Sequence, residues 1–139
     1  MLRLAPHPYT RDDADAWIAS HAVERAAGTA YRFVIEEGGR MIGTCDVDEL
    51  ADRTGDLGYW LEEAAWGRGI ATEASRAVVA FGFADLRLER LTSGHAADNP
   101  NSGRILAKLG FTQTGRARMW SRPRNTEIDQ LKYERKRPA

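Results

Sequence analysis

One stretch of the sequence that could do chemistry is a pair of glycines, Gly67 and Gly69, with Arg68 between them. Glycine lacks the Cβ atom that would hold a ligand away from the backbone amides, and arginine adds a charge that pairs with phosphate oxygens. A helix is expected to start directly afterwards, and the free N–H groups of a helix start attract anions. The stretch lacks both the Gly-Lys-Ser/Thr of a Walker loop and the three-glycine dinucleotide spacing. The pattern predicts phosphate binding, and a tight strand-to-helix turn is the alternative.

Several other side chains have the right chemistry to move a proton. Asp46, Glu49 and Glu62 are carboxylates that could accept one through water, and His95 is of the residue type most often used as a general acid or base. We name Glu49 and His95 as candidate catalytic bases. The alternative is that the carboxylates are surface acids and that His95 is a packing or hydrogen-bonding residue. Cys45 is not expected to be a nucleophile, because the sequence places no base beside it.

The elements that would position these residues follow from the hydrophobic pattern. In order, the pattern predicts a helix over 11–26 that starts at Thr10, strands over 31–36, 41–47 and 57–61, a helix over 68–86, a strand over 88–97, a helix over 99–110, and strands over 111–120 and 127–135. Gly38 and Gly39 suit a tight hairpin between the first two strands. Polar runs over 51–56 and 121–126 are expected to be loops. The glycine pair therefore connects a strand to the longest helix.

Length and composition limit the class of protein. The chain has 139 residues, of which 42% are hydrophobic, which suits a single domain over 1–139 with one core. Lys plus Arg and Asp plus Glu each number 20, so neither a nucleic-acid nor a membrane-surface partner is expected. Cys45 is the single cysteine and no Cys/His cluster has zinc spacing, so neither a disulfide scaffold nor a metal site is indicated. With no recognisable signal peptide or membrane span, a cytoplasmic protein is expected.

Five short stretches occur in one order from Gly58 onward. They are Gly58–Leu61, Trp66–Ala74, Asp98–Arg104, Lys108–Phe111 and Asp129–Arg135. In this combination they resemble the GNAT family of acyl-CoA-dependent N-acetyltransferases, and most of all its RimJ/RimL branch, which acetylates protein N-termini and various small amines. Together they extend over more than half of the chain, which makes the combination much more specific than any one stretch.

The resemblance implies an α+β fold with a mixed, mostly antiparallel sheet, a splayed central strand pair and flanking helices. The strand Tyr59–Leu61 would splay from its neighbour, and its exposed backbone would pair with the pantetheine arm of coenzyme A as if with an added strand. The family's first strand and first helix are missing from this sequence, which enters at Pro8 near the family's second helix. Either a second copy covers the exposed edge of the Tyr31 strand in a homodimer, or the start of the chain is shortened.

The resemblance also implies that acetyl-CoA is the cofactor. The family's phosphate loop has the form Arg/Gln-x-x-Gly-x-Gly/Ala, in which Gly69 and Ala71 match the small positions and Trp66 stands where Arg or Gln often does. That departure matters little if the contact comes mainly from backbone amides. The residues expected to bind the cofactor are Tyr59, Trp60, Leu61, Trp66, Gly67, Arg68, Gly69, Ile70, Ala71, Thr72, Asn99, Ser102, Arg104 and Lys108.

The same resemblance assigns chemistry to the start of the helix at Asn99. Asn99 would hold the pantetheine, and Ser102 would protonate or solvate the departing thiolate, with helix capping as the alternative for both residues. Many family members use a tyrosine as the acid at the position of Leu106, which leaves Ser102 or water for that role here. A backbone N–H near Trp60 or Leu61 would stabilise the oxyanion.

The expected activity is transfer of the acetyl group of acetyl-CoA to a primary amine by direct attack. The amine would be a protein N-terminus or a small-molecule amine, and no motif discriminates between them. The alternative is a non-catalytic acyl-CoA-binding module that keeps the cofactor cleft, a possibility that the short front end of the chain supports. The expected partners are therefore acetyl-CoA, an amine acceptor and, at the exposed sheet edge, a second copy.

Overall fold

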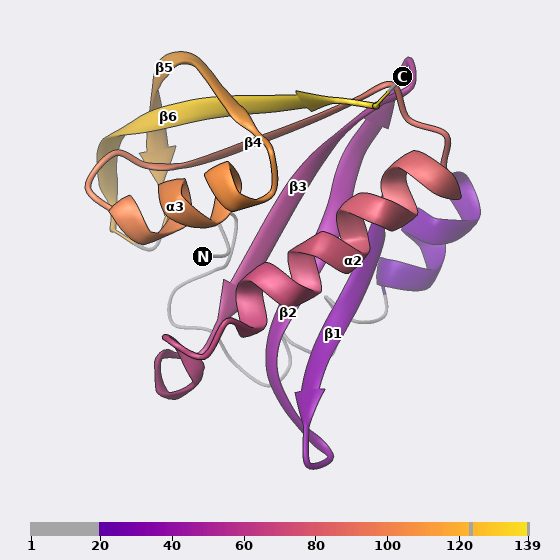
Figure 1. Ribbon diagram of the computed structural model, residues 1–139, viewed down its shortest axis with the longest axis horizontal. Coiled ribbons are helices and arrows are strands. Elements are labelled where there is room, and N and C mark those ends of the chain that lie inside the picture. The colour runs from indigo at the N-terminus through magenta and orange to yellow at the C-terminus, as the bar shows by residue number, and fades with distance from the viewer. Residues whose placement is uncertain (1–19, 123, 139) are drawn as a thin grey trace.

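The computed structural model describes residues 20–122 and 124–138. Within these ranges, six strands form one sheet in the order β1-β2-β3-β4-β6-β5, and every neighbouring pair is antiparallel except β3 and β4 (Figure 1). The strands are β1 (Tyr31–Glu37), β2 (Arg40–Ala51), β3 (Thr54–Leu61), β4 (Arg90–Ala96), β5 (Thr112–Ser121) and β6 (Thr126–Lys136). The expected α+β class with a mixed, mostly antiparallel sheet is confirmed.

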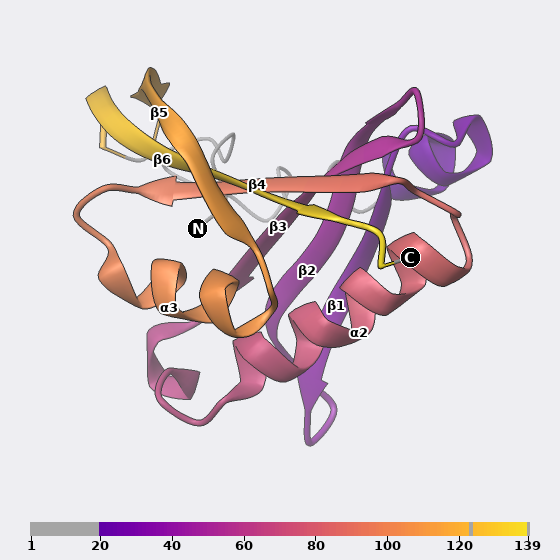
Figure 2. The same ribbon diagram turned by 45° about the horizontal axis from the view of Figure 1, so that its top comes forward.

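Two helices, α2 (Ile70–Ala84) and α3 (Pro100–Lys108), cover one face of this sheet (Figure 2). A third helical segment spans residues 20–27, whereas the helix start expected at Thr10 lies outside the described residues. A 3-10 turn, Glu63–Ala65, lies between β3 and α2 in the chain. Among the described helices, none is long and apolar enough to cross a membrane.

The turn between β2 and β3 is tighter than the sequence indicates. The polar run there predicts a loop, but β2 continues to Ala51, and only Asp52 and Arg53 form the turn, with φ values of 51° and 59°. The polar side chains misled the prediction because some of them are paired within the sheet. Asp48, just before this run, accepts a hydrogen bond of 3.2 Å from Arg32 of β1, and Asp56 within it accepts one of 2.7 Å from the Thr92 hydroxyl of β4. A strand whose outer face is paired in this way lacks the apolar alternation that marks a strand in a sequence.

The core lies between α2, α3 and the sheet. Its main cluster consists of Cys45, Val47, Leu57, Val78, Val79, Leu88, Leu91, Leu106, Leu109 and Phe111. Burial of each large aliphatic side chain stabilises the fold by about 1.5–3 kcal/mol, which fixes both helices on the strands. Helix α2 starts at Ile70 and not at Arg68, because Gly69 has a left-handed backbone (φ 76°) that a helix cannot include.

The two central strands pair only at their starts. Residues Thr54–Asp56 of β3 are in register with Arg90–Thr92 of β4. One side-chain bond extends the contact, since Ser93 Oγ donates to the Leu57 carbonyl at 2.8 Å. Beyond this point the strands diverge in both views (Figures 1 and 2). The expected splay is therefore confirmed, and it opens toward the glycine loop.

Candidate functional site

The direction of the backbone along β3 determines which groups face the cleft between β3 and β4. The Leu57 carbonyl points toward β4, from which it accepts its side-chain bond. Backbone groups two residues apart in a strand point the same way, so those of Tyr59 and Leu61 also face the cleft. The groups of Trp60 face β2, since a Cβ at Gly43 would lie 2.2 Å from the Trp60 carbonyl oxygen. Of the two positions expected to supply the oxyanion N–H, Leu61 has the required direction.

The glycine loop presents backbone amides to open space. Gly67 and Gly69 both have φ of 76°, a conformation that other residues rarely adopt. A Cβ built at either glycine would meet no atom within 4 Å. The N–H groups of residues 70–72 have no partner within α2, and the first helical bond runs from the Glu73 N–H to the Gly69 carbonyl at 3.0 Å. The positive φ values fit the tight-turn alternative, and the open, amide-lined space fits phosphate binding as well.

Arg68 is bonded to a carboxylate in this structure. Its Nη1 and Nη2 atoms donate to the two oxygens of Glu37, at the end of β1, at 2.9 and 2.5 Å. These hydrogen bonds lower the pKa of the Glu37 carboxyl. Both side chains are about half exposed, so water screens the pair and a phosphate can compete for the guanidinium.

Trp66 closes the end of the splayed strand. Its indole Nε1 donates to the Leu61 carbonyl at 2.8 Å, while 59% of the residue remains exposed. The bond occupies the last cleft-facing carbonyl of β3 and fixes the ring beside the glycine loop. Trp66 therefore acts on the loop by hydrogen bonding to the β3 backbone. This differs from the polar contact that Arg or Gln would supply at this position.

The first turn of α3 carries the next candidate groups. Asn99 holds the N-cap position but makes no side-chain capping bond, so capping does not account for this residue. Its Nδ2 donates to Ser102 Oγ at 3.4 Å. From the other side of the cleft, the Tyr59 hydroxyl donates to the Ser102 carbonyl oxygen at 3.5 Å. Burial raises the pKa of Tyr59, which keeps the hydroxyl protonated and able to donate.

Two cations expected to contact the cofactor lie on the outer side of α3. Arg104 and Lys108 are both exposed, and their spacing of four residues puts them on the same face of the helix. Arg104 Nη2 also donates to Asn101 Oδ1 at 2.6 Å. This face therefore presents positive charge to solvent.

His95 lies beneath α3 and is only 7% exposed. Its Nδ1 is 2.7 Å from the Ala96 carbonyl oxygen, which can only accept, so Nδ1 carries a proton. Its Nε2 is 3.1 Å from the Tyr133 hydroxyl and accepts from it in the neutral ring. Both ring nitrogens are thus engaged, as the hydrogen-bonding alternative for this residue requires.

Two core residues bear on which mechanisms the chain can use. Leu106 is fully buried, so the position of the family's acidic tyrosine is part of the core here. Cys45 is 1% exposed, and burial raises the pKa of its thiol to about 12. Its Sγ lies 3.7 Å from Ser75 Oγ. The thiol stays protonated near neutral pH, which argues against an acetyl-cysteine intermediate.

The three candidate carboxylates have different surroundings. Asp46 is buried and accepts from Arg32 Nη1 at 2.6 Å; burial raises the pKa of the Asp46 carboxyl and Arg32 opposes that rise. Glu62 forms a two-bond ion pair with Arg40. Glu49 is exposed and has a positive φ of 51° where the β2 register shifts against β3.

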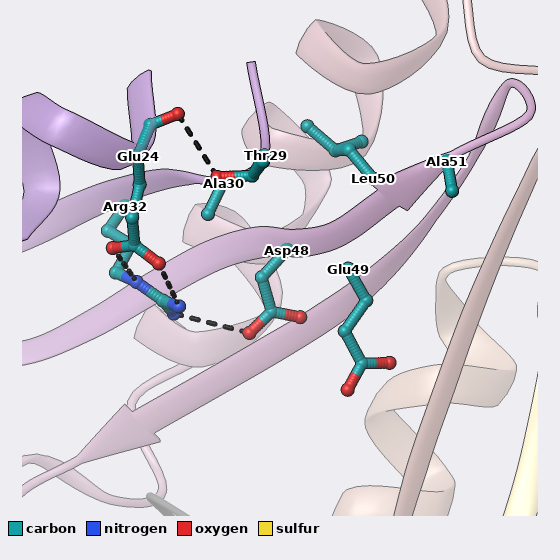
Figure 3. Close-up of a pocket in the computed structure, with 8 residues that line it drawn as sticks. All are labelled: Glu24, Thr29, Ala30, Arg32, Asp48, Glu49, Leu50 and Ala51. Carbon is teal, nitrogen blue, oxygen red and sulfur yellow. Dashed lines mark hydrogen bonds and ion pairs between the residues drawn. The ribbon is translucent and has the colours of Figure 1, made fainter. Parts of the chain in front are cut away.

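Glu49 lines an open hollow beside the β2–β3 turn (Figure 3). The lining consists of Glu24, Thr29, Ala30, Arg32, Asp48, Glu49, Leu50 and Ala51. Asp48, Glu49 and Asp56 place carboxylate oxygens within 4.8 Å of one another. Such a concentration of negative charge attracts cations, including protonated amines. Glu49 thus lies near the start of β3, whereas His95 lies against Gly103 of α3, the residue after Ser102.

Two contacts of the site could not be found from the sequence. Tyr133 is part of the closing stretch quoted above, but only the antiparallel register of β6 against β4 places it opposite Ser93 and beside His95. Glu37 is 31 residues from Arg68 along the chain and meets it through the β1–β2 hairpin. In both cases the partner depends on strand order, which no local pattern encodes.

Comparison with known proteins gives an independent view of this fold and site. A family model described as "Acetyltransferase (GNAT) domain" matches residues 1–112. The chain is 42% identical over 82 residues to "Probable N-acetyltransferase YjcK" of Bacillus subtilis, a match that covers 57% of this chain and 45% of that protein. The chain spans about half the length of the curated relatives it matches first.

Two solved structures show the same fold. The ribosomal-protein-S5-alanine acetyltransferase of Vibrio fischeri superposes with a TM-score of 0.85 at 20% identity, over 93% of this chain and 73% of that one. RimJ of Mycobacterium smegmatis, in complex with CoA-disulfide, gives 0.83 at 23% identity, over 90% of this chain and 61% of that one. With the family match over residues 1–112, these findings lead to one conclusion: the chain belongs to the GNAT family of acetyltransferases.

Proposed function

We propose that this chain transfers the acetyl group of acetyl-CoA to a primary amine by direct attack. The observation that carries the proposal is the open glycine loop over 67–72, which the Trp66 indole connects to the cleft-facing carbonyl of Leu61 at the end of β3. The loop offers a place for a diphosphate, and β3 offers a place for an amide-bearing arm. The family match and the coenzyme in the RimJ structure support the same cofactor.

The described residues offer a partner to each part of this cofactor. The amides of 67–72 hold the diphosphate, with Arg68 available once it leaves Glu37. The backbone of Tyr59 pairs with the pantetheine arm, and Asn99 holds that arm from α3. Bound acetyl-CoA supplies a thioester whose carbonyl carbon an amine can attack. The Leu61 N–H then donates to the acetyl oxygen as negative charge develops there.

Proton movement completes the reaction. A C–N bond forms to the acceptor, the C–S bond breaks, and the thiolate leaves. The Ser102 hydroxyl donates a proton to the thiolate and regains one from water. The amine loses its proton to water, because Glu49 lies near the start of β3, away from the Leu61 N–H, and both nitrogens of His95 are already bonded.

The acceptor is a protein N-terminus or a small-molecule amine. Support for a cationic acceptor comes from the acidic lining around Glu49, since a protonated amine is attracted to it before it loses its proton. The same proposal places the chain in the cytoplasm.

Thiol release tests the proposal directly. The protein is mixed with acetyl-CoA and a panel of N-terminal peptides and polyamines, and free coenzyme A is measured with a chromogenic disulfide. We expect amine-dependent release with at least one acceptor class. Cofactor binding by calorimetry without release on any amine would instead favour a non-catalytic acyl-CoA-binding module. Absence of both binding and a rise in melting temperature with acetyl-CoA would exclude either function.

A homodimer is part of the proposal. Strand β1 is outermost in the sheet formed by the described residues, and Val34 on it is 44% exposed. Such an edge is a template for pairing with a second copy. Light scattering after size-exclusion chromatography is expected to give twice the mass of one chain, and a monomer across a wide concentration range would rule the dimer out.

A further inference from the structure

The first turn of α3 is supported by three side chains from three different strands. Tyr59 comes from β3, His95 from β4 and Tyr133 from β6. Because β3 and β4 diverge beneath this turn, no pairing between them fixes its position over the cleft. Side chains must therefore set the distance between the first turn of α3 and the strands beneath it.

The backbone of α3 lies directly on two of these side chains. A Cβ added at Gly103 would lie 3.1 Å from His95 Nε2 and 3.2 Å from the Tyr133 hydroxyl. Such distances are tighter than ordinary van der Waals contact, so any larger residue at 103 would lift the helix or displace the pair. The Tyr59 hydroxyl reaches the carbonyl of the preceding residue, Ser102, from the far side of the cleft. Glycine at 103 suits this close approach.

Hydrogen bonds link the same pair to the start of the helix. The Tyr133 hydroxyl donates to His95 Nε2, and His95 Nδ1 donates to the Ala96 carbonyl at 2.7 Å. The Asn99 N–H donates to that same Ala96 carbonyl at 2.9 Å. A continuous set of bonds thus runs from β6 through β4 to the residue that begins α3.

The two rings also pack against one another. The centroids of His95 and Tyr133 are 5.3 Å apart, with their planes inclined by 32°. His95 is 7% exposed, so the bonds of the pair lie in a water-poor environment, where a fixed geometry is maintained more strictly than at the surface.

We infer that His95 and Tyr133 form a positioning pair that sets Asn99 and Ser102 over the cleft, so that the Ser102 hydroxyl reaches the departing thiolate. The inference rests on the proposed acetyl transfer. Neither member of the pair touches the substrate in this account. The pair acts through the height and orientation of the first turn of α3, and a misplaced turn lowers the rate of the chemical step more than the binding of a cofactor held at the glycine loop.

The test is a double-mutant cycle with Tyr133→Phe, His95→Phe and the double variant. Tyr133→Phe keeps the ring and removes the donor, and we expect kcat to fall by about tenfold, with the Kd for acetyl-CoA changed by no more than about twofold. The double variant should lose little more than the worse single one, because either change breaks the same unit. Wild-type kcat in Tyr133→Phe, or effects that simply multiply, would overturn the inference.

Tyr31→Phe is the matched control, because it removes a hydroxyl from a tyrosine that packs against Phe81, away from α3. We expect its kcat to equal that of the wild type. A loss of kcat in this control as large as in Tyr133→Phe would contradict a local role for the pair. The thermal unfolding midpoint of every variant is measured alongside, to separate a positioning effect from loss of folded protein.

A second readout does not depend on turnover. Hydrogen exchange of the α3 amides, followed by mass spectrometry, should be at least about fivefold faster in Tyr133→Phe than in the wild type and unchanged in Tyr31→Phe. If the wild-type protein acetylates no amine, the proposed function fails, and this measurement still decides whether the pair holds the first turn of α3. Equal exchange in Tyr133→Phe and the wild type would overturn it.

Discussion

The two ends of the splayed cleft offer different kinds of chemical group. At the glycine loop, Gly67 and Gly69 have open space beside them and the loop offers backbone N–H groups. At the first turn of α3, buried rings of His95 and Tyr133 press against the backbone, and the candidate groups are the side chains of Asn99 and Ser102. One end therefore offers backbone amides, and the other offers side chains on a turn that two buried rings support.

This difference indicates that the loop serves cofactor binding and that the α3 end serves proton transfer. Backbone amides at a helix start bind an anion without a particular side chain, so they suit the invariant diphosphate of a cofactor. Proton transfer to a thiolate depends on the placement of one hydroxyl to a fraction of an ångström, so it suits a turn fixed by packing. Changes at the loop should therefore alter affinity, and loss of the Ser102 hydroxyl at α3 should alter turnover.

The largest effect is expected for Gly69→Leu. The new side chain fills the space where the diphosphate would lie, and acetyl-CoA affinity should fall by about 100-fold, or about 3 kcal/mol, as measured by calorimetry. Left-handed strain alone costs about 1–2 kcal/mol of stability. Gly28→Leu is the matched control, because Gly28 has φ of 71° and equally open surroundings. Equal affinities in the two variants would refute a phosphate site at the loop.

A smaller effect, on turnover alone, is expected for Ser102→Ala. Loss of the hydroxyl should lower kcat by about 30-fold, less than a full general-acid effect because water can partly replace it, while the Kd for acetyl-CoA stays within about twofold. Steady-state kinetics and calorimetry measure the two quantities. Ser102→Thr keeps a hydroxyl and should recover part of the rate. Full turnover in Ser102→Ala would show that the residue supplies no proton.

Asn99→Ala should affect binding more than rate. The amide makes no capping bond, so helix stability should change little, whereas loss of one hydrogen bond to the cofactor arm weakens affinity by about fivefold, or about 1 kcal/mol. Calorimetry with acetyl-CoA measures the change. Asn101→Ala, two residues further along α3, is the control and should stay within about twofold. If both variants bind as the wild type does, Asn99 has no contact with the cofactor.

The smallest effect is expected for Glu37→Gln. It releases Arg68 from its carboxylate partner, so acetyl-CoA should bind about twofold more tightly at low salt, with the gain disappearing at high ionic strength. Glu36→Gln removes the same charge from the same hairpin without touching Arg68 in this structure, and it should leave the affinity unchanged. Equal gains in both variants would indicate a general field effect.

The sequence alone reveals the loop better than the α3 end. Gly67 and Gly69 are local signals, because positive φ and absent Cβ atoms are properties of single residues. The splay of β3 and the roles of Asn99 and Ser102 came only with the family resemblance. The contact of Tyr133 with His95 could not be predicted from the sequence, because it depends on which strand β6 pairs with and in what register. The β2–β3 turn was misplaced, because paired acids such as Asp56 resemble a solvated loop.

The most direct test of the account asks whether the amides of the glycine loop bind the diphosphate. Backbone amide NMR signals of residues 67–72 are followed during titration with coenzyme A and with pantetheine, which lacks the diphosphate. We expect large shifts at these six amides with coenzyme A and none with pantetheine. Binding of coenzyme A that leaves them unshifted would contradict it.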